Sequence, residues 1–286
     1  MHGVDIDPVR VRLGTLAALL VVAATAVLTS GCGASLDPVA NAATRTSGAS
    51  TLRFSMNVKL KTSAAATAIP MTVDGAIDSS AHRMQLSMDI SKAAALSGGS
   101  DRLGRMTIVE DGPMMYMSGS SFGGVLPGGK SWVAIDLSKI PSLQGSLSAL
   151  TSGPTDPRTS LAQLRKAGNV VKIGSQTIGG APTTRYNVLV DLRQGLNKLE
   201  GAQRQAMQQV LDRLESTGGR YVPADAWIDA NGYLRRFSMS IPNYFGTGSS
   251  FSLTMNLFGF GQPVSIAVPT SDQVADLTDR LSSLGR

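Results

Sequence analysis

The sequence predicts an α+β fold built on a large antiparallel sheet of about ten strands with a few helices. Strand-like alternation of apolar and polar residues recurs along most of the chain, and strands follow strands instead of alternating with helices. The 31 Gly and 13 Pro residues supply many turns, and 42% hydrophobic residues suit a folded protein. No inner linker interrupts this pattern, so we expect residues 37–286 to form one domain.

The first predicted element is a helix from Pro38 to about Thr46. Asp37 is a suitable N-cap, Pro38 fits the first helical turn, and Gly48 follows the last predicted residue. The period then changes to two, and residues 52–60 place every second, apolar side chain on one face. Further strands are predicted at 69–77, 84–90, 106–109, 114–117 and 131–137.

The second half of the chain predicts more strands and the longest helix. Asp156 and Pro157 predict a helix that ends at Gly168. Strands are expected at 169–178, 183–192 and 251–257, a hairpin over 224–241 with its turn at residues 230–232, and a last strand at 264–268. Helices are expected at 193–216, with an apolar stripe of Leu196, Leu199, Met207, Val210, Leu211 and Leu214, and at 272–284. Two Gly/Ser-rich stretches, 96–104 and 118–130, are predicted to be mobile.

The N-terminal segment predicts export and lipid anchoring. Residues 13–28 form an apolar run without charges, which is short for a membrane span and typical of a signal peptide. Small residues precede Cys32 as in the bacterial lipobox, although Thr29 stands where Leu is commoner. We therefore expect residues 1–31 to be a cleaved lipoprotein signal peptide, and residues 32–36 to be a short tether that begins at Cys32. An uncleaved anchor or a buried free cysteine is the alternative.

Acylation of Cys32, by chains such as palmitate, would hold the protein firmly in the cell membrane on its extracytoplasmic face. Each buried CH₂ group contributes about 0.8 kcal/mol, so two or three acyl chains anchor a protein almost permanently.

Residue counts exclude several kinds of site and partner. With Cys32 as the one cysteine and only two histidines, the chain forms no internal disulfide, cysteine zinc site or iron–sulfur cluster. The net charge of +6 is scattered without a run of five basic residues, and aromatic residues make up 5%, so we expect no nucleic-acid binding. A mild attraction to anionic lipid head groups fits this charge better.

Three motifs allow a catalytic interpretation that their context disfavours. Residues 124–131 match the P-loop pattern but lead into a predicted strand instead of a helix. His82 begins a strand, and no Gly-x-Ser-x-Gly turn offers a nucleophile. Asp225 and Asp229 flank Trp227 on one strand face, which is commonly a solvated face or a loop contact. We therefore expect a protein that is not an enzyme and needs no metal or cofactor.

Four features together point to one lipoprotein family. They are the lipobox at Cys32, the opening strand at 51–60, the segment Lys130–Leu137, and the hairpin segment Pro223–Asp229 with the closing strand and helix behind it. In these features the chain resembles the actinobacterial LppX/LprG-type lipoproteins, which share the fold of the LolA/LolB lipoprotein carriers. The resemblance covers nearly all of residues 32–286.

The resemblance implies a LolA-like half-barrel, a strongly curved antiparallel sheet whose concave side is covered by a few helices, with a lipid-sized apolar cavity between them. Methionines on the strand faces suit such a cavity because Met is flexible, and a packed core is the alternative. We expect ten residues to line the cavity: Leu52, Phe54, Met56, Val58, Met71, Val73, Met84, Leu86, Met88 and Met255.

The predicted function is an exported lipoprotein that binds the acyl chains of lipids or glycolipids and carries them across the cell envelope. Its expected partners are membrane lipids or glycolipids and the cell membrane itself, and a membrane transporter is a further candidate. One alternative is an RseB-like sensor or adaptor that regulates an envelope or anti-sigma protein. Another is a structural envelope protein with a filled core.

Overall fold

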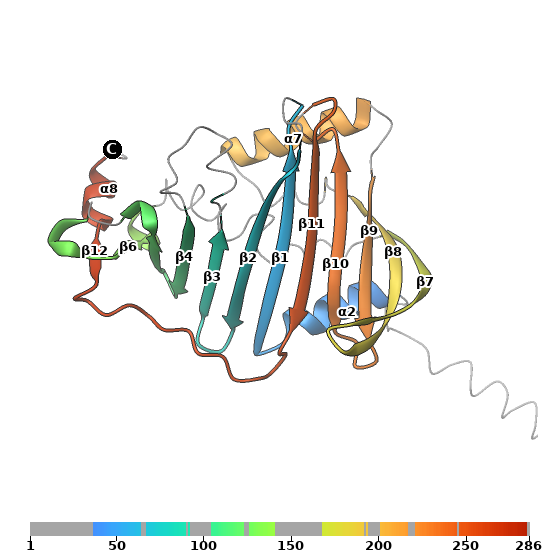
Figure 1. Ribbon diagram of the computed structural model, residues 1–286, viewed down its shortest axis with the longest axis horizontal. Coiled ribbons are helices and arrows are strands. Elements are labelled where there is room, and N and C mark those ends of the chain that lie inside the picture. The colour runs from blue at the N-terminus through green and yellow to red at the C-terminus, as the bar shows by residue number, and fades with distance from the viewer. Residues whose placement is uncertain are drawn as a thin grey trace, which may run out of the picture. The chain divides into compact units, whose positions relative to one another are not determined.

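Twelve strands of the described residues pair into one open, curved sheet (Figure 1). The computed structural model describes residues 37–63, 67–89, 91, 104–122, 126–140, 168–191, 193, 201–216, 221–244 and 246–284. The strand order is β12-β6-β5-β4-β3-β2-β1-β11-β10-β9-β8-β7, and each neighbouring pair is antiparallel except β12 with β6. The predicted α+β class with a large antiparallel sheet is thus confirmed.

The predicted strands up to residue 258 are found within three residues of their expected bounds. Strands β1 to β6 span Thr51–Lys61, Ile69–Asp78, Arg83–Asp89, Arg105–Asp111, Met114–Gly119 and Trp132–Asp136. Strands β7 to β12 span Gly168–Ile178, Ala181–Asp191, Tyr221–Asp229, Leu234–Pro242, Ser250–Phe258 and Val274–Asp276. Helices α2, α7 and α8 span Pro38–Ser47, Gly201–Ser216 and Thr278–Leu284.

Helix α2 begins and ends where its capping residues predict. The carboxylate of Asp37 accepts hydrogen bonds from the N–H groups of Val39 and Ala40 at 2.9 and 3.1 Å. These bonds satisfy donors that have no partner inside the helix. At the other end, Gly48 is the C-cap and donates its N–H to Thr44.

Two predictions near the C-terminus are wrong. Residues 264–268 alternate in polarity but form no strand, because the chain after β11 crosses the ends of other strands to reach the opposite edge of the sheet (Figure 1). There β12 pairs in parallel with β6. The helix expected at 272–284 is restricted to α8, since residues 274–276 belong to β12 and Asp276 accepts a hydrogen bond from the N–H of Thr278.

The loops give a mixed result. Within the stretch 118–130, residues 120–122 and 127–129 form short 3-10 turns, and the second of these leads into β6. The P-loop-like motif therefore ends before a strand, as predicted. Other predictions lie outside the described residues: the signal peptide, Cys32 and the tether, the helix from Asp156, most of the stretch 96–104, and Leu196 and Leu199.

Candidate functional site

The ten predicted lining residues lie together on one face of the sheet, on strands β1, β2, β3 and β11. Nine of them are buried, and Met71 is partly buried and packs against the cluster that contains the other nine. All ten belong to one apolar cluster, which we call the apolar face cluster. The structure therefore places the ten residues together in one cluster, and their lining of a cavity stays a prediction.

Methionine is concentrated in one row that crosses six strands. Met56 on β1 pairs with Met255 on β11 on one side and with Val73 on β2 on the other. The row continues in both directions, to Phe237 on β10 and to Met88 on β3 and Met106 on β4. Met side chains are unbranched and adapt to irregular neighbours, so this row carries the side-chain type that suits an adaptable lining.

Helices α2 and α7 contribute to the same cluster. Val39, Ala42 and Ala43 of α2 are buried in it, as are Leu211 and Leu214 of α7. Both helices therefore pack on the face of the sheet that carries the methionine row, as the predicted architecture requires. The sequence signal for α7 was its apolar stripe, which includes Leu211 and Leu214.

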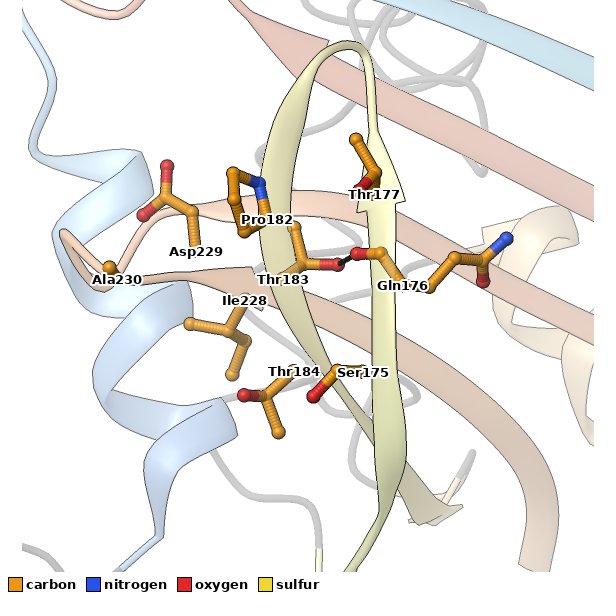
Figure 2. A pocket seen from close by; sticks show the side chains of 9 residues that line it. All are labelled: Ser175, Gln176, Thr177, Pro182, Thr183, Thr184, Ile228, Asp229 and Ala230. Carbon is orange, nitrogen blue, oxygen red and sulfur yellow. Dashed lines mark hydrogen bonds between the residues drawn. The ribbon is translucent and has the colours of Figure 1, made fainter.

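An open pocket of about 500 Å³ lies beside this cluster, at the end of the sheet formed by β7, β8 and β9 (Figure 2). Its lining includes a row of three paired residues, Ser175, Thr184 and Ile228. Ile228 is 8% exposed and belongs to the apolar face cluster, so the pocket reaches that cluster from the solvent. The pocket thus combines an apolar floor with hydroxyl groups.

Helix α2 is linked to the strand next to the pocket. Leu234 on β10 is the strand partner of Ile228, and its N–H donates to the hydroxyl of Thr46 at 2.9 Å. Thr46 is fully buried. This bond holds the C-terminal turn of α2 beside the pocket floor. In the sequence, the signal that could have indicated this pocket was the run of Ser and Thr residues between 175 and 184.

The carboxylate of Asp229, at the pocket wall, is fully engaged. Its Oδ1 accepts from the N–H groups of Asn231 and Tyr233, both at 2.9 Å, and its Oδ2 accepts from Nε of Arg235 at 2.6 Å. Asp229 is therefore a structural residue of the β9–β10 turn. The pocket gains no free carboxylate from it.

Trp227 and Asp225 lie on the face of the sheet opposite the apolar face cluster, and both belong to a polar network there. The Asp225 carboxylate accepts from Arg185 at 2.8 Å, and this bond, with the attraction of the opposite charges, raises the pKa of Arg185. The indole N–H of Trp227 donates to Gln176 at 2.8 Å, and the guanidinium groups of Arg185 and Arg236 stand over its ring. The two carboxylates and the tryptophan share one strand face, as predicted, but each has a structural contact.

His82 lies in the turn between β2 and β3 and is exposed. Its Nδ1 lies 2.9 Å from the carbonyl oxygen of Ser79, within the same turn. Its backbone has a φ of 53°, a left-handed value that suits a turn. This is a local turn contact and brings no nucleophile to the ring.

Searches of the described part of the chain for two further features were negative. No group of three or more His, Cys, Asp or Glu side chains in it is placed to hold a metal ion. Its helices are too short or too polar for any of them to span a bilayer.

Comparisons with known proteins give distant similarities. No protein-family model matches the chain. An uncharacterized 31.2 kDa protein of Streptomyces griseus, from the rplA-rplJ intergenic region, is 24% identical over 161 residues, which are 55% of this chain. The match spans about half the length of that relative, 52%.

Three of the solved structures to which the chain is similar are bacterial proteins. Lipoprotein LppX of Mycobacterium tuberculosis is 17% identical, covering 81% of this chain and all of its own, with a TM-score of 0.44. LprF of Mycobacterium bovis is 14% identical, covering 82% and 96%, with a TM-score of 0.45. MucB of Pseudomonas aeruginosa, in its complex with MucA, is 13% identical, covering 83% and 58%, with a TM-score of 0.30. LppX, the first of these, is a lipoprotein, and LppX-type lipoproteins are the proteins that the sequence resembles.

Proposed function

We propose that this chain is an exported lipoprotein, anchored at Cys32, that binds the acyl chains of membrane lipids and carries them through the cell envelope. The observation that supports this most directly is the pocket whose floor, Ile228, belongs to the apolar face cluster. An acyl chain that enters there would meet apolar side chains, and hydroxyl groups at the rim would meet a polar head. The role is one of binding and not of catalysis.

The driving force would be removal of the alkyl chain from water. Each Å² of apolar surface that leaves water contributes roughly 25 cal/mol, so a carrier needs an apolar lining that adapts to the chain. The methionine row around Met56 supplies such a lining, because Met can change rotamer at little cost. The packed cluster would open as the lipid enters, and α2 and α7 are the elements that would move.

Native mass spectrometry of the whole protein, purified from a bacterium that exports it, tests the proposal. We expect masses of bound lipid, and acylation at Cys32 that Cys32→Ser abolishes. Thr184→Trp fills the pocket between Ser175 and Ile228, so we expect it to lower lipid occupancy severalfold. Thr72→Trp, at an exposed position of β2, is the matched control and should leave occupancy unchanged. Absence of lipid from the unaltered protein, even from a lipid-rich host, would overturn the proposal.

A further inference from the structure

A stacked aromatic pair lies between two arginines. Its rings are those of Tyr233, in the β9–β10 turn, and Phe260, just after β11. The rings of Tyr233 and Phe260 lie 4.4 Å apart with an interplanar angle of 7°. The guanidinium of Arg45, from α2, stands 5.0 Å from the centre of the Tyr233 ring, and that of Arg235 stands 5.0 Å from the centre of the Phe260 ring. The aromatic pair is thus in contact with guanidinium groups from two separate elements, α2 and β10.

A third arginine joins the same site from β1. Arg53 donates from Nη2 to the carbonyl oxygen of Pro263 at 3.0 Å, and its Nη1 lies beside Gly259. Its strand partner is Phe258, a large apolar side chain that is 43% exposed. We call these six residues the basic aromatic patch: Arg45, Arg53, Tyr233, Arg235, Phe258 and Phe260.

The basic aromatic patch carries excess positive charge. Asp229 pairs with Arg235 at 2.6 Å. Within the described ranges, no carboxylate pairs with Arg45 or Arg53. Asp78, at the nearby end of β2, accepts hydrogen bonds from its own turn, including the N–H of Ser80 at 3.1 Å. No carboxylate of the described residues thus neutralises these two guanidinium groups, and one of them, that of Arg53, belongs to the strand partner of the exposed Phe258.

The basic aromatic patch borders the pocket. Asp229 lines the pocket and also pairs with Arg235. The side chain of Arg45 approaches Gly232, in the turn that Asp229 stabilises. Arg45 also belongs to α2, the first described element, which begins six residues after Cys32. Six residues span at most about 22 Å, so an anchor at Cys32 would keep α2 near the bilayer.

We propose that the basic aromatic patch docks the folded body on an anionic phospholipid bilayer, with the mouth of the pocket beside the lipids. Guanidinium groups bind phosphate through paired hydrogen bonds, and an arginine near an anionic surface strengthens binding about fivefold. Exposed aromatic side chains favour the interface, where one side is apolar and the other wet. The inference rests on the proposed function only in that the Cys32 anchor and the cargo make such docking useful.

A fluorescent label on the whole chain tests the docking. In the Cys32→Ser background, Gln262→Cys places one environment-sensitive dye at an exposed position in the loop of the patch, and Ser240→Cys places it at an exposed position near the other end of β10. The Cys32→Ser change removes the acyl anchor and leaves one cysteine for the dye, so the response at position 262 reports contacts of the folded body. We expect dye emission at position 262 to rise on vesicles with one third phosphatidylglycerol, not on pure phosphatidylcholine, and the rise to fade with added salt. The dye at position 240 should respond to neither.

Charge variants separate docking from folding. Arg45→Gln with Arg53→Gln should raise the anionic lipid concentration needed for the response about thirtyfold. Arg45→Lys with Arg53→Lys keeps the charge but loses the paired hydrogen bonds, so its response should lie between that of the double Gln variant and that of the unaltered chain. Lys59→Gln with Lys172→Gln removes the same charge from exposed positions outside the patch and should change little. An equal loss in this last pair, or an equal response on neutral vesicles, would overturn the inference.

The two proposals can fail separately. Lipid that copurifies with a chain whose patch does not respond to anionic vesicles would leave the carrier proposal standing and remove the docking surface. A normal vesicle response in a chain that holds no lipid would leave the docking proposal standing and overturn the carrier proposal.

Discussion

The ring of Phe54 occupies the space in which a side chain of Gly75 would stand. The two residues are direct partners on β1 and β2, and both face the apolar cluster. A Cβ atom at position 75 would collide with the Phe54 ring and with the backbone oxygen of Gln85 on β3. Glycine is therefore required here by the close approach of β1, β2 and β3, although β-strands usually disfavour it.

We expect Gly75→Ala to destabilise the fold by about 3 kcal/mol or more, at the upper end of the range for overpacked cores. Urea unfolding followed by circular dichroism measures this. Gly174→Ala on β7, where an added Cβ meets nothing within 4 Å, is the control and should cost little. Phe54→Leu should rescue Gly75→Ala only in part, since the clash with the Gln85 backbone remains. Full rescue would show that the ring alone requires the glycine.

Thr46→Val should detach the end of α2 from β10. It leaves the N–H of Leu234 buried without its partner hydroxyl, which costs about 1–3 kcal/mol. Hydrogen exchange followed by mass spectrometry should show faster exchange in α2 and at Leu234. Thr44→Val, an exposed threonine of the same helix, should leave the exchange unchanged. Equal protection of α2 and Leu234 from exchange in the two variants would show that this hydrogen bond does not hold α2 to β10.

Asp229 and Asp225 offer a matched test on one strand. The Asp229 side chain is 4% exposed and holds Arg235 and two N–H groups of the turn, so Asp229→Ala should cost about 3 kcal/mol. The Asp225 side chain is 23% exposed, and its partner Arg185 is 40% exposed, so Asp225→Ala should cost less than about 1 kcal/mol. Urea unfolding compares them, and equal losses would contradict the structural role assigned to Asp229.

Acid should weaken the contact between α8 and β12 through Asp276. Hydrogen bonds from the side chain and the N–H of Thr278 lower the pKa of Asp276 below 3.8. A carboxyl group whose pKa is lowered by folding stabilises the fold above its unfolded pKa, and this stabilisation is lost as pH falls through the folded value. Asp276→Asn should therefore lower the melting temperature at pH 7, and its difference from the unaltered protein should shrink below about pH 4. A difference that stays constant down to pH 2 would assign the effect to another contact.

Local patterns predicted the sheet well because each strand carries its own signal. Residues 52–60 alternate cleanly, and the Asn231-Gly232 turn specifies its hairpin, so both were found without tertiary information. The segment 264–268 shows the limit of this reasoning. Its apolar and polar residues alternate clearly, whereas those of β12 alternate only weakly. Yet β12 forms the strand, because β6 offers it a free edge. No local pattern reports which edge a distant segment will meet.

The site was predicted only in part, for a similar reason. The apolar face follows from alternation, so Met56 and Met255 were placed correctly on it. The pocket depends on the β7–β8 hairpin meeting β9 and on α2 standing beside Leu234, contacts that join distant parts of the chain. The three cations around Tyr233 and Phe260 likewise come from three elements, and in the sequence they look scattered.

The pairing of β1 with β11 has a consequence for how the protein folds. Met56 and Met255 are neighbours across this seam although about 200 residues separate them in the chain. Contacts between such distant segments form late and slowly, because the long loop must close first. We expect the hairpins on either side of this seam to form early. The two halves of the sheet can pair only after β11 is available to β1. A chain that crosses a membrane unfolded can thus complete its core only near the end of its passage.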